Sequence, residues 1–160
     1  MKAIAWLLRL GVGGLFAWAG VLKLRDPAAF ATDIANYQLF PALAPWGAAT
    51  LPLIELVLGL ALILAPSAWR RGAALATAGL MAVFTAGIAQ AVARGIRIEC
   101  GCFGGASGPV TSWTIARDVA LLAAAIALVV LEHHLKIAPS PTTSKMAPST
   151  SPITSAVAPK

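Results

Sequence analysis

The chain has 160 residues, of which 59% are apolar and only 11% are charged, and its formal net charge is +6. Soluble domains are roughly 45–50% apolar and about 25% charged, so this composition argues against a soluble domain and favours lipid as the solvent. The basic residues stand singly or in small groups between apolar runs. This pattern indicates topology signals and contacts with lipid head groups, and it argues against a nucleic-acid surface.

Four segments satisfy the requirement of a membrane-spanning helix for about 20 mostly apolar residues. The predicted spans are residues 4–24, 45–64, 71–93 and 112–131. Most of the tryptophans fall near the ends of these spans, where aromatic side chains meet the membrane interface: Trp6, Trp46, Trp69 and Trp113. The predicted fold is therefore all-α, a polytopic membrane protein with a bundle of four transmembrane helices.

The first span carries one charged residue, Arg9, about a turn inside its start, and we expect this side chain to snorkel to the membrane surface. Ala17-Trp18-Ala19 also fits a signal-peptidase site. The apolar run continues past this site, however, and the basic region before it is a single lysine, so a retained span is the better interpretation.

Residues 26–44 differ from the spans around them. The segment opens with Asp26-Pro27 and carries Phe30, Ile34 and Tyr37 on a mildly amphipathic pattern. Such a pattern predicts a short interfacial helix between the first and second spans, followed by a turn into the bilayer.

The second span contains Pro52 and, one turn later, Glu55. An ionisable group near the middle of a span is costly and is a candidate for function. The alternative is a structural hydrogen bond, either to the carbonyl that Pro52 frees or to Lys23.

The connection between the third and fourth spans contains both cysteines, as Glu99-Cys100-Gly101-Cys102-Phe103. Two residues this close can form a small disulfide, and strained, exposed disulfides exchange readily. A redox pair is thus one interpretation. The cysteines could instead be small space-filling side chains. They could also be half of a tetrahedral zinc site, although His133 and His134 should lie across the bilayer; no metal is predicted.

Arg117-Asp118, early in the fourth span, should not pair with each other on a helix, because adjacent positions point in different directions. Residues 1–136 are predicted to form the membrane domain. Residues 137–160, rich in Pro, Ser and Thr, are predicted to form a disordered tail.

The distribution of basic residues does not indicate which side of the bundle faces the cytoplasm. One side is flanked by Lys2, Arg9, Arg70, Arg71 and Lys136. The other side is flanked by Lys23, Arg25, Arg94, Arg97 and Arg117. The positive-inside rule therefore returns a tie. Disulfide chemistry needs an oxidising compartment, and on this ground we predict a periplasmic cysteine loop with both termini cytoplasmic.

The sequence also resembles a known family. Residues 16–24, followed by Asp26-Pro27, and residues 51–56 resemble the first two helices of DoxX-like membrane proteins. Residues 94–104, with the cysteine pair, closely resemble the cysteine motif of the methylamine utilisation protein MauE family. Trp113 and Arg117-Asp118 also fit that branch.

The resemblance implies a multi-pass protein of the bacterial inner membrane that assists maturation of an exported protein. That partner would be the small subunit of methylamine dehydrogenase, and the help would be disulfide formation, processing or transport. Cys100 and Cys102 would be the catalytic redox pair if the protein is an enzyme, with Glu55 supporting a proton or quinone step. No cofactor is certain, and a membrane quinone is the candidate. The alternatives are a non-enzymatic scaffold or transport helper, and a quinone-linked oxidoreductase subunit.

Overall fold

The structure is a computed structural model that describes residues 2–96 and 110–137. These residues form α1 (Lys2–Arg25), α2 (Pro27–Asn36), the 3-10 helix η1 (Pro41–Leu43), α3 (Ala44–Leu64), α4 (Ser67–Ala93) and α5 (Ser112–Ile137). Four stretches are long and apolar enough to cross a membrane: Ala3–Arg25, Pro41–Leu64, Ser67–Ala93 and Trp113–His134. The predicted all-α, four-span membrane protein with a short helix after the first span is confirmed. The predicted tail lies outside the described residues from residue 138 onward.

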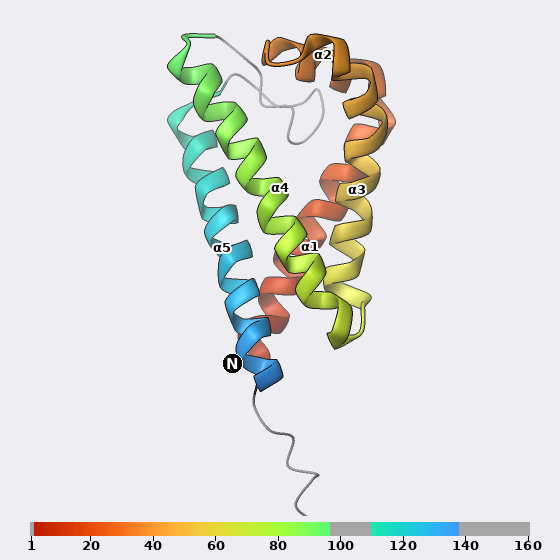
Figure 1. The fold of residues 1–160 in the computed structure, drawn as a ribbon, viewed down its shortest axis with the longest axis vertical. Helices are drawn as coiled ribbons and strands as arrows, with labels where there is room; N and C mark the ends of the chain where they lie inside the picture. The colour runs from red at the N-terminus through yellow and green to blue at the C-terminus, as the bar shows by residue number, and fades with distance from the viewer. Residues whose placement is uncertain (1, 97–109, 138–160) are drawn as a thin grey trace, which may run out of the picture.

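The four long helices form one bundle, and α2 lies across one end of it (Figure 1). The helix α1 packs mainly on α3, and α4 packs mainly on α5. The start of α1 and the end of α5 lie at the end of the bundle away from α2. The end of α4 and the start of α5 lie at the α2 end. The segment that connects α4 to α5 therefore leaves and rejoins the bundle at the end that α2 covers.

Local sequence signals explain where α2 begins and where α4 ends. Asp26 caps α2, because its side chain accepts a hydrogen bond from the backbone N–H of Ala29 at 2.9 Å, and Pro27 occupies the first helical position. The helix α4 ends at Ala93, and Gly95, two residues later, has a φ of +69° that glycine adopts at little cost. The Asp26 cap and Pro27 thus begin α2 as a helix separate from α1.

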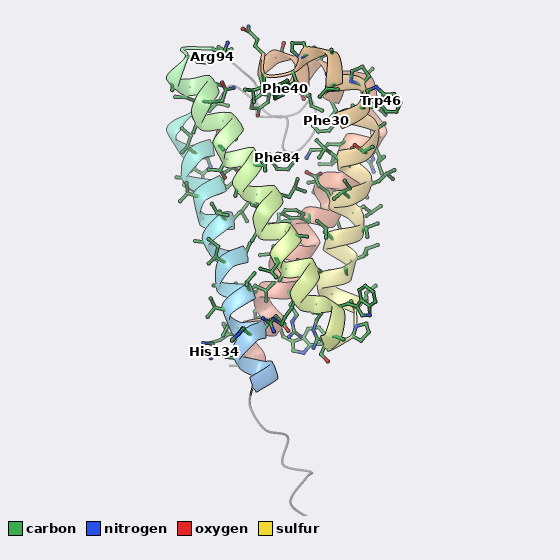
Figure 2. The ribbon with its side chains drawn as sticks, in the orientation of Figure 1. Phe30, Phe40, Trp46, Phe84, Arg94 and His134 are labelled. Atoms are coloured by element: carbon green, nitrogen blue, oxygen red, sulfur yellow. The ribbon has the colours of Figure 1, made fainter. Side chains whose placement is uncertain are left out.

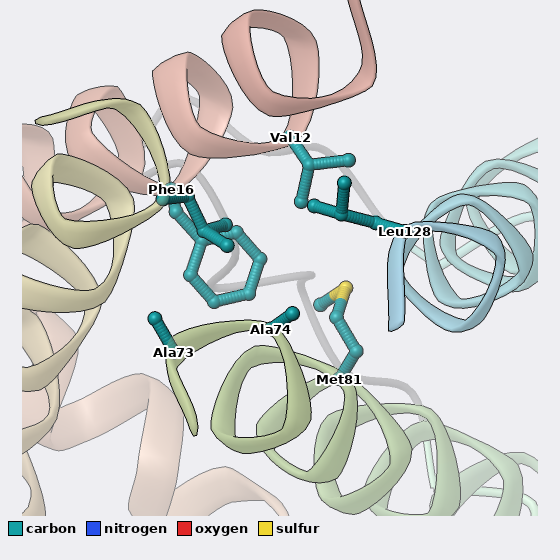
Figure 3. Packing of buried hydrophobic residues seen from close by; sticks show 7 residues of the cluster. Val12, Phe16, Ala73, Ala74, Met81 and Leu128 are labelled. Atoms are coloured by element: carbon teal, nitrogen blue, oxygen red, sulfur yellow. The ribbon is translucent and has the colours of Figure 1, made fainter. Parts of the chain in front are cut away.

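The surface and the interior of the bundle are both typical of a membrane protein. All five tryptophans are at least half exposed, including Trp18 in the middle of α1, which suits contact with lipid. A buried apolar cluster joins α1, α4 and α5 through side chains such as Phe16, Met81 and Leu128, as Figure 3 shows. The helices thus share a core while large apolar side chains also face outward.

Candidate functional site

A buried ion pair joins α1 to α3. Lys23 Nζ donates to Glu55 Oε1 at 2.5 Å, and each residue is only 2% exposed. This is the interaction with Lys23 that the sequence offered as the structural alternative for Glu55, and the structure confirms it. Removing both charges from water carries a large desolvation cost, which close pairing offsets. In the sequence Lys23 closes the first span and is one of two candidate partners for Glu55; the structure decides between them.

Glycines on the facing sides of α1 and α3 place the pair. A Cβ added at Gly20 would lie 2.7 Å from the carbonyl oxygen of Pro52, and one at Gly59 would lie 2.6 Å from the backbone nitrogen of Ala17. Only glycine permits backbones to approach so closely, and small residues commonly line contacts between membrane helices. The close approach of α1 and α3 brings Lys23 within hydrogen-bonding distance of Glu55.

Two aromatic rings also flank the ammonium group of Lys23. Its Nζ lies 4.9 Å from the ring centre of Phe30 on α2 and 5.1 Å from that of Phe84 on α4. Both distances fall within the reach of a cation–π interaction. The second carboxylate oxygen of Glu55, Oε2, is buried and has no hydrogen-bond partner among the described residues. The pair therefore has hydrogen-bonding capacity that its neighbours do not use.

A cavity of about 320 Å³ lies beside Lys23, between α2, η1, α3 and α4; we call it the α2 cavity. Its described lining is mostly apolar and includes Phe30, Ile34, Phe40, Leu51 and Phe84. Figure 2 labels Phe30, Phe40 and Phe84, which lie toward the α2 end of the bundle. Polar groups in the lining are few: Lys23, Asp33 and Tyr37. An apolar cavity with a few polar groups is the usual form of a small-molecule site.

A second cavity of about 30 Å³ is lined by both members of the ion pair, Lys23 and Glu55, and by Asp118, among others. This volume is enough for a water molecule. Asp118 is 2% exposed. Contrary to expectation, Arg117 donates to Asp118 from Nε at 3.2 Å and from Nη2 at 3.1 Å. The arginine side chain is long enough to curl back to its neighbour, which a rule based on the direction of Cβ atoms overlooks.

The two cysteines lie outside the described residues, so their predicted pairing remains a prediction. The structure does describe the last turns of α4 before that segment. Gln90 Nε2 donates to the carbonyl oxygen of Tyr37 at 3.1 Å, and Arg94 Nη1 donates to that of Gln38 at 3.5 Å. These bonds tie the end of α4 to the end of α2. His133 and His134 lie near the opposite end of α5 (Figures 1 and 2).

A second buried charge cluster lies at the end of the bundle away from α2. The sequence did not predict it. Arg9 Nε donates to Glu132 Oε1 at 2.6 Å, and Arg70 Nε lies 3.6 Å from Glu132 Oε2. Arg9 is 5% exposed, so it does not snorkel to the surface as predicted. The partners are 123 positions apart, and no local pattern links them. The one available signal was a lone arginine within an apolar span.

Comparison with known proteins assigns the family. The model of the methylamine utilisation protein MauE family matches residues 1–131. A MauE of Paracoccus denitrificans is 36% identical over 128 residues, which cover 78% of this chain and 68% of that protein. A MauE of Methylophilus methylotrophus is 40% identical over 102 residues, or 62% of this chain and 52% of the relative. A MauE of Paracoccus versutus is 37% identical over 126 residues, or 77% and 67%. No solved structure gives a significant match. The chain is a multi-pass membrane protein that belongs to the methylamine utilisation protein MauE family.

Proposed function

We propose that this protein serves methylamine utilisation in the bacterial inner membrane by assisting the maturation of an exported protein. The relatives are named for methylamine utilisation, which supports the pathway. The matched regions span 52–68% of those relatives. The partner would be the small subunit of methylamine dehydrogenase, and the help would be formation of its disulfides.

Cys100 and Cys102 would carry out this chemistry as a thiol–disulfide pair. Two thiols of the partner would exchange with the Cys100–Cys102 disulfide, so that the partner gains a disulfide and the pair becomes a dithiol. Reoxidation of the dithiol then needs an acceptor for two electrons and two protons. The cysteine segment would face the periplasm, where disulfides persist, and both termini would be cytoplasmic.

One observation supports the placement of this chemistry. The described residues on either side of the cysteine segment, Ile96 and Val110, belong to the end of the bundle that carries α2. The Lys23–Glu55 pair and the α2 cavity are at that same end. The chain therefore enters and leaves the cysteine segment at the same end of the bundle as the α2 cavity.

The thiol state tests the proposal. Membranes of a strain that expresses the intact protein are alkylated with a mass-tagged maleimide, before and after mild reduction. We expect the tag to reach Cys100 and Cys102 only after reduction. The double variant Cys100→Ser/Cys102→Ser should leave the partner incompletely oxidised, while Thr111→Ser, an equally small change beside the segment, should not. A partner that matures normally with the double variant would favour a scaffold without redox chemistry.

A further inference from the structure

The α2 cavity has the chemistry of a binding site for a planar, lipid-soluble molecule. Its volume of about 320 Å³ is at the small end of the range of ligand sites, about 300–1,000 Å³. This volume suits a single substituted ring better than a lipid with two acyl chains. Phe30 and Phe84 both lie in the wall, with ring centres 4.9 Å and 5.1 Å from Lys23 Nζ. Aromatic walls favour a flat ring through stacked and edge-to-face contacts.

The exposed edge of the cavity, here called its rim, indicates that a ligand can enter from the bilayer. Several apolar side chains in its lining are strongly exposed: Leu39 at 48%, Phe40 at 70%, Leu43 at 58% and Val83 at 65%. In a membrane these side chains contact lipid rather than water. A water-soluble ligand would gain nothing from such a rim, whereas a molecule dissolved in the bilayer can pass over it.

The polar groups of the cavity favour a carbonyl over an anionic group. An ammonium group has three donors, and among the described residues only Glu55 Oε1 accepts one from Lys23. The other charged group in the lining is Asp33. The positive charge of Lys23 is thus balanced by Glu55. A phosphate or carboxylate head group would meet no excess of positive charge, but a neutral carbonyl oxygen can accept a hydrogen bond from Lys23.

We propose that the α2 cavity binds the head group of a membrane quinone, with a quinone carbonyl accepting a hydrogen bond from Lys23 Nζ. This inference deepens the proposed function by naming the acceptor. Reforming the Cys100–Cys102 disulfide breaks two S–H bonds and forms one S–S bond. The two electrons and two protons released reduce the quinone to its quinol.

Binding can be measured without any turnover. The full-length protein is placed in nanodiscs and labelled with a photoreactive azido-ubiquinone, and the adduct is mapped by mass spectrometry. We expect saturable labelling of peptides from α2 or α4 that decylubiquinone abolishes by competition. Decylbenzene, which has the same tail and no carbonyl, should compete poorly. Equal competition by decylbenzene would show an apolar lipid site and overturn the proposal.

Two glycines of α4 supply matched variants. Gly87 lines the cavity, whereas a Cβ added at Gly79 meets nothing within 4 Å. Gly87→Leu should therefore abolish the competed labelling, and Gly79→Leu should preserve it. Gly87→Ala is a milder variant that the fold tolerates, because its Cβ would lie at an ordinary 3.7 Å from the Tyr37 ring; it should weaken binding. Labelling of both Gly87 variants at the wild-type level would overturn the proposal.

The donor is tested separately. Lys23→Met combined with Glu55→Gln removes the ammonium group without leaving a buried carboxylate, and it should weaken competition by decylubiquinone about tenfold, the value of one hydrogen bond to a charged group. Unchanged competition would refute the role of Lys23. Cys100→Ser/Cys102→Ser should bind the probe normally. If that variant also leaves partner maturation intact, the redox function fails although the quinone site stands.

Discussion

Lys23 Nζ of α1 lies 2.5 Å from Glu55 Oε1 of α3, and both residues are almost completely buried in a bundle with few other charges. The pair joins the two helices that pack most extensively. Lys23 lines both the α2 cavity and the smaller cavity, and Glu55 lines the smaller one. The contributions of Lys23 and Glu55 to stability are therefore coupled, because neither charge can be removed without leaving the other buried and unpaired.

The first prediction concerns this coupling. Lys23→Met should destabilise the protein by about 3–5 kcal/mol, because it leaves the carboxylate of Glu55 buried without a partner. Lys23→Met/Glu55→Met should recover most of that loss. Arg25→Met, at an exposed position in the last turn of the same helix, should change stability by less than about 0.5 kcal/mol. Denaturant unfolding in detergent measures all three, and equal losses for the single and double variants would contradict the coupling.

The second prediction concerns the contact between α1 and α3. Gly59→Ala should destabilise the bundle by about 1–3 kcal/mol, since the new methyl group would lie 2.6 Å from the backbone of Ala17 and Gly13 and must force the helices apart. Gly11→Ala on α1 meets nothing within 4 Å and should be neutral or stabilising by about 0.5–1 kcal/mol. The same unfolding measurement applies. Similar values for the two variants would show that the close approach is not required.

The third prediction ranks the charges at the other end of the bundle. Arg9→Met should destabilise more than Arg70→Met, because the Arg9 side chain is 6% exposed and that of Arg70 is 22% exposed, and because the nearest Arg70–Glu132 distance is 3.6 Å. Glu132→Ala should be the most harmful, since it leaves two guanidinium groups without their shared carboxylate. Thermal unfolding at low and high salt checks the ranking. The destabilisation caused by Arg9→Met should persist at high salt, because buried pairs are weakly screened. A destabilisation that disappears at high salt would contradict the burial of the Arg9–Glu132 pair.

The fourth prediction concerns orientation. In a Cys100→Ser/Cys102→Ser background, Asn36→Cys places a thiol at the exposed end of α2, and Ser67→Cys places one at the exposed start of α4 at the opposite end of the bundle. A membrane-impermeant maleimide should label Asn36→Cys in intact spheroplasts. Ser67→Cys should be labelled only after the membrane is opened. The reverse pattern would place the cysteine segment in the cytoplasm.

Much of the membrane architecture could be predicted from residue patterns. The length of each apolar run predicted the four spans, and the Asp26-Pro27 start with its amphipathic pattern predicted α2, because both signals are local. Glu55 was a candidate from sequence for the same reason, since an acidic residue within an apolar span stands out without any knowledge of its neighbours. The cysteine pair was equally visible, and its pairing remains a prediction because it lies outside the described residues.

The sequence by itself therefore determined the class of protein, the helices and the family resemblance, all of which depend on composition, period and short motifs. The tertiary structure alone decided which charges are buried and what they contact. Arg9 looks like a surface charge in the sequence, but helix packing places it beside Glu132, 123 positions away. Lys23 was one of two candidate partners for Glu55, and helix packing decided between them across 32 positions. The α2 cavity has no signal in any one segment, because it exists only where α2, η1, α3 and α4 meet without filling the space between them.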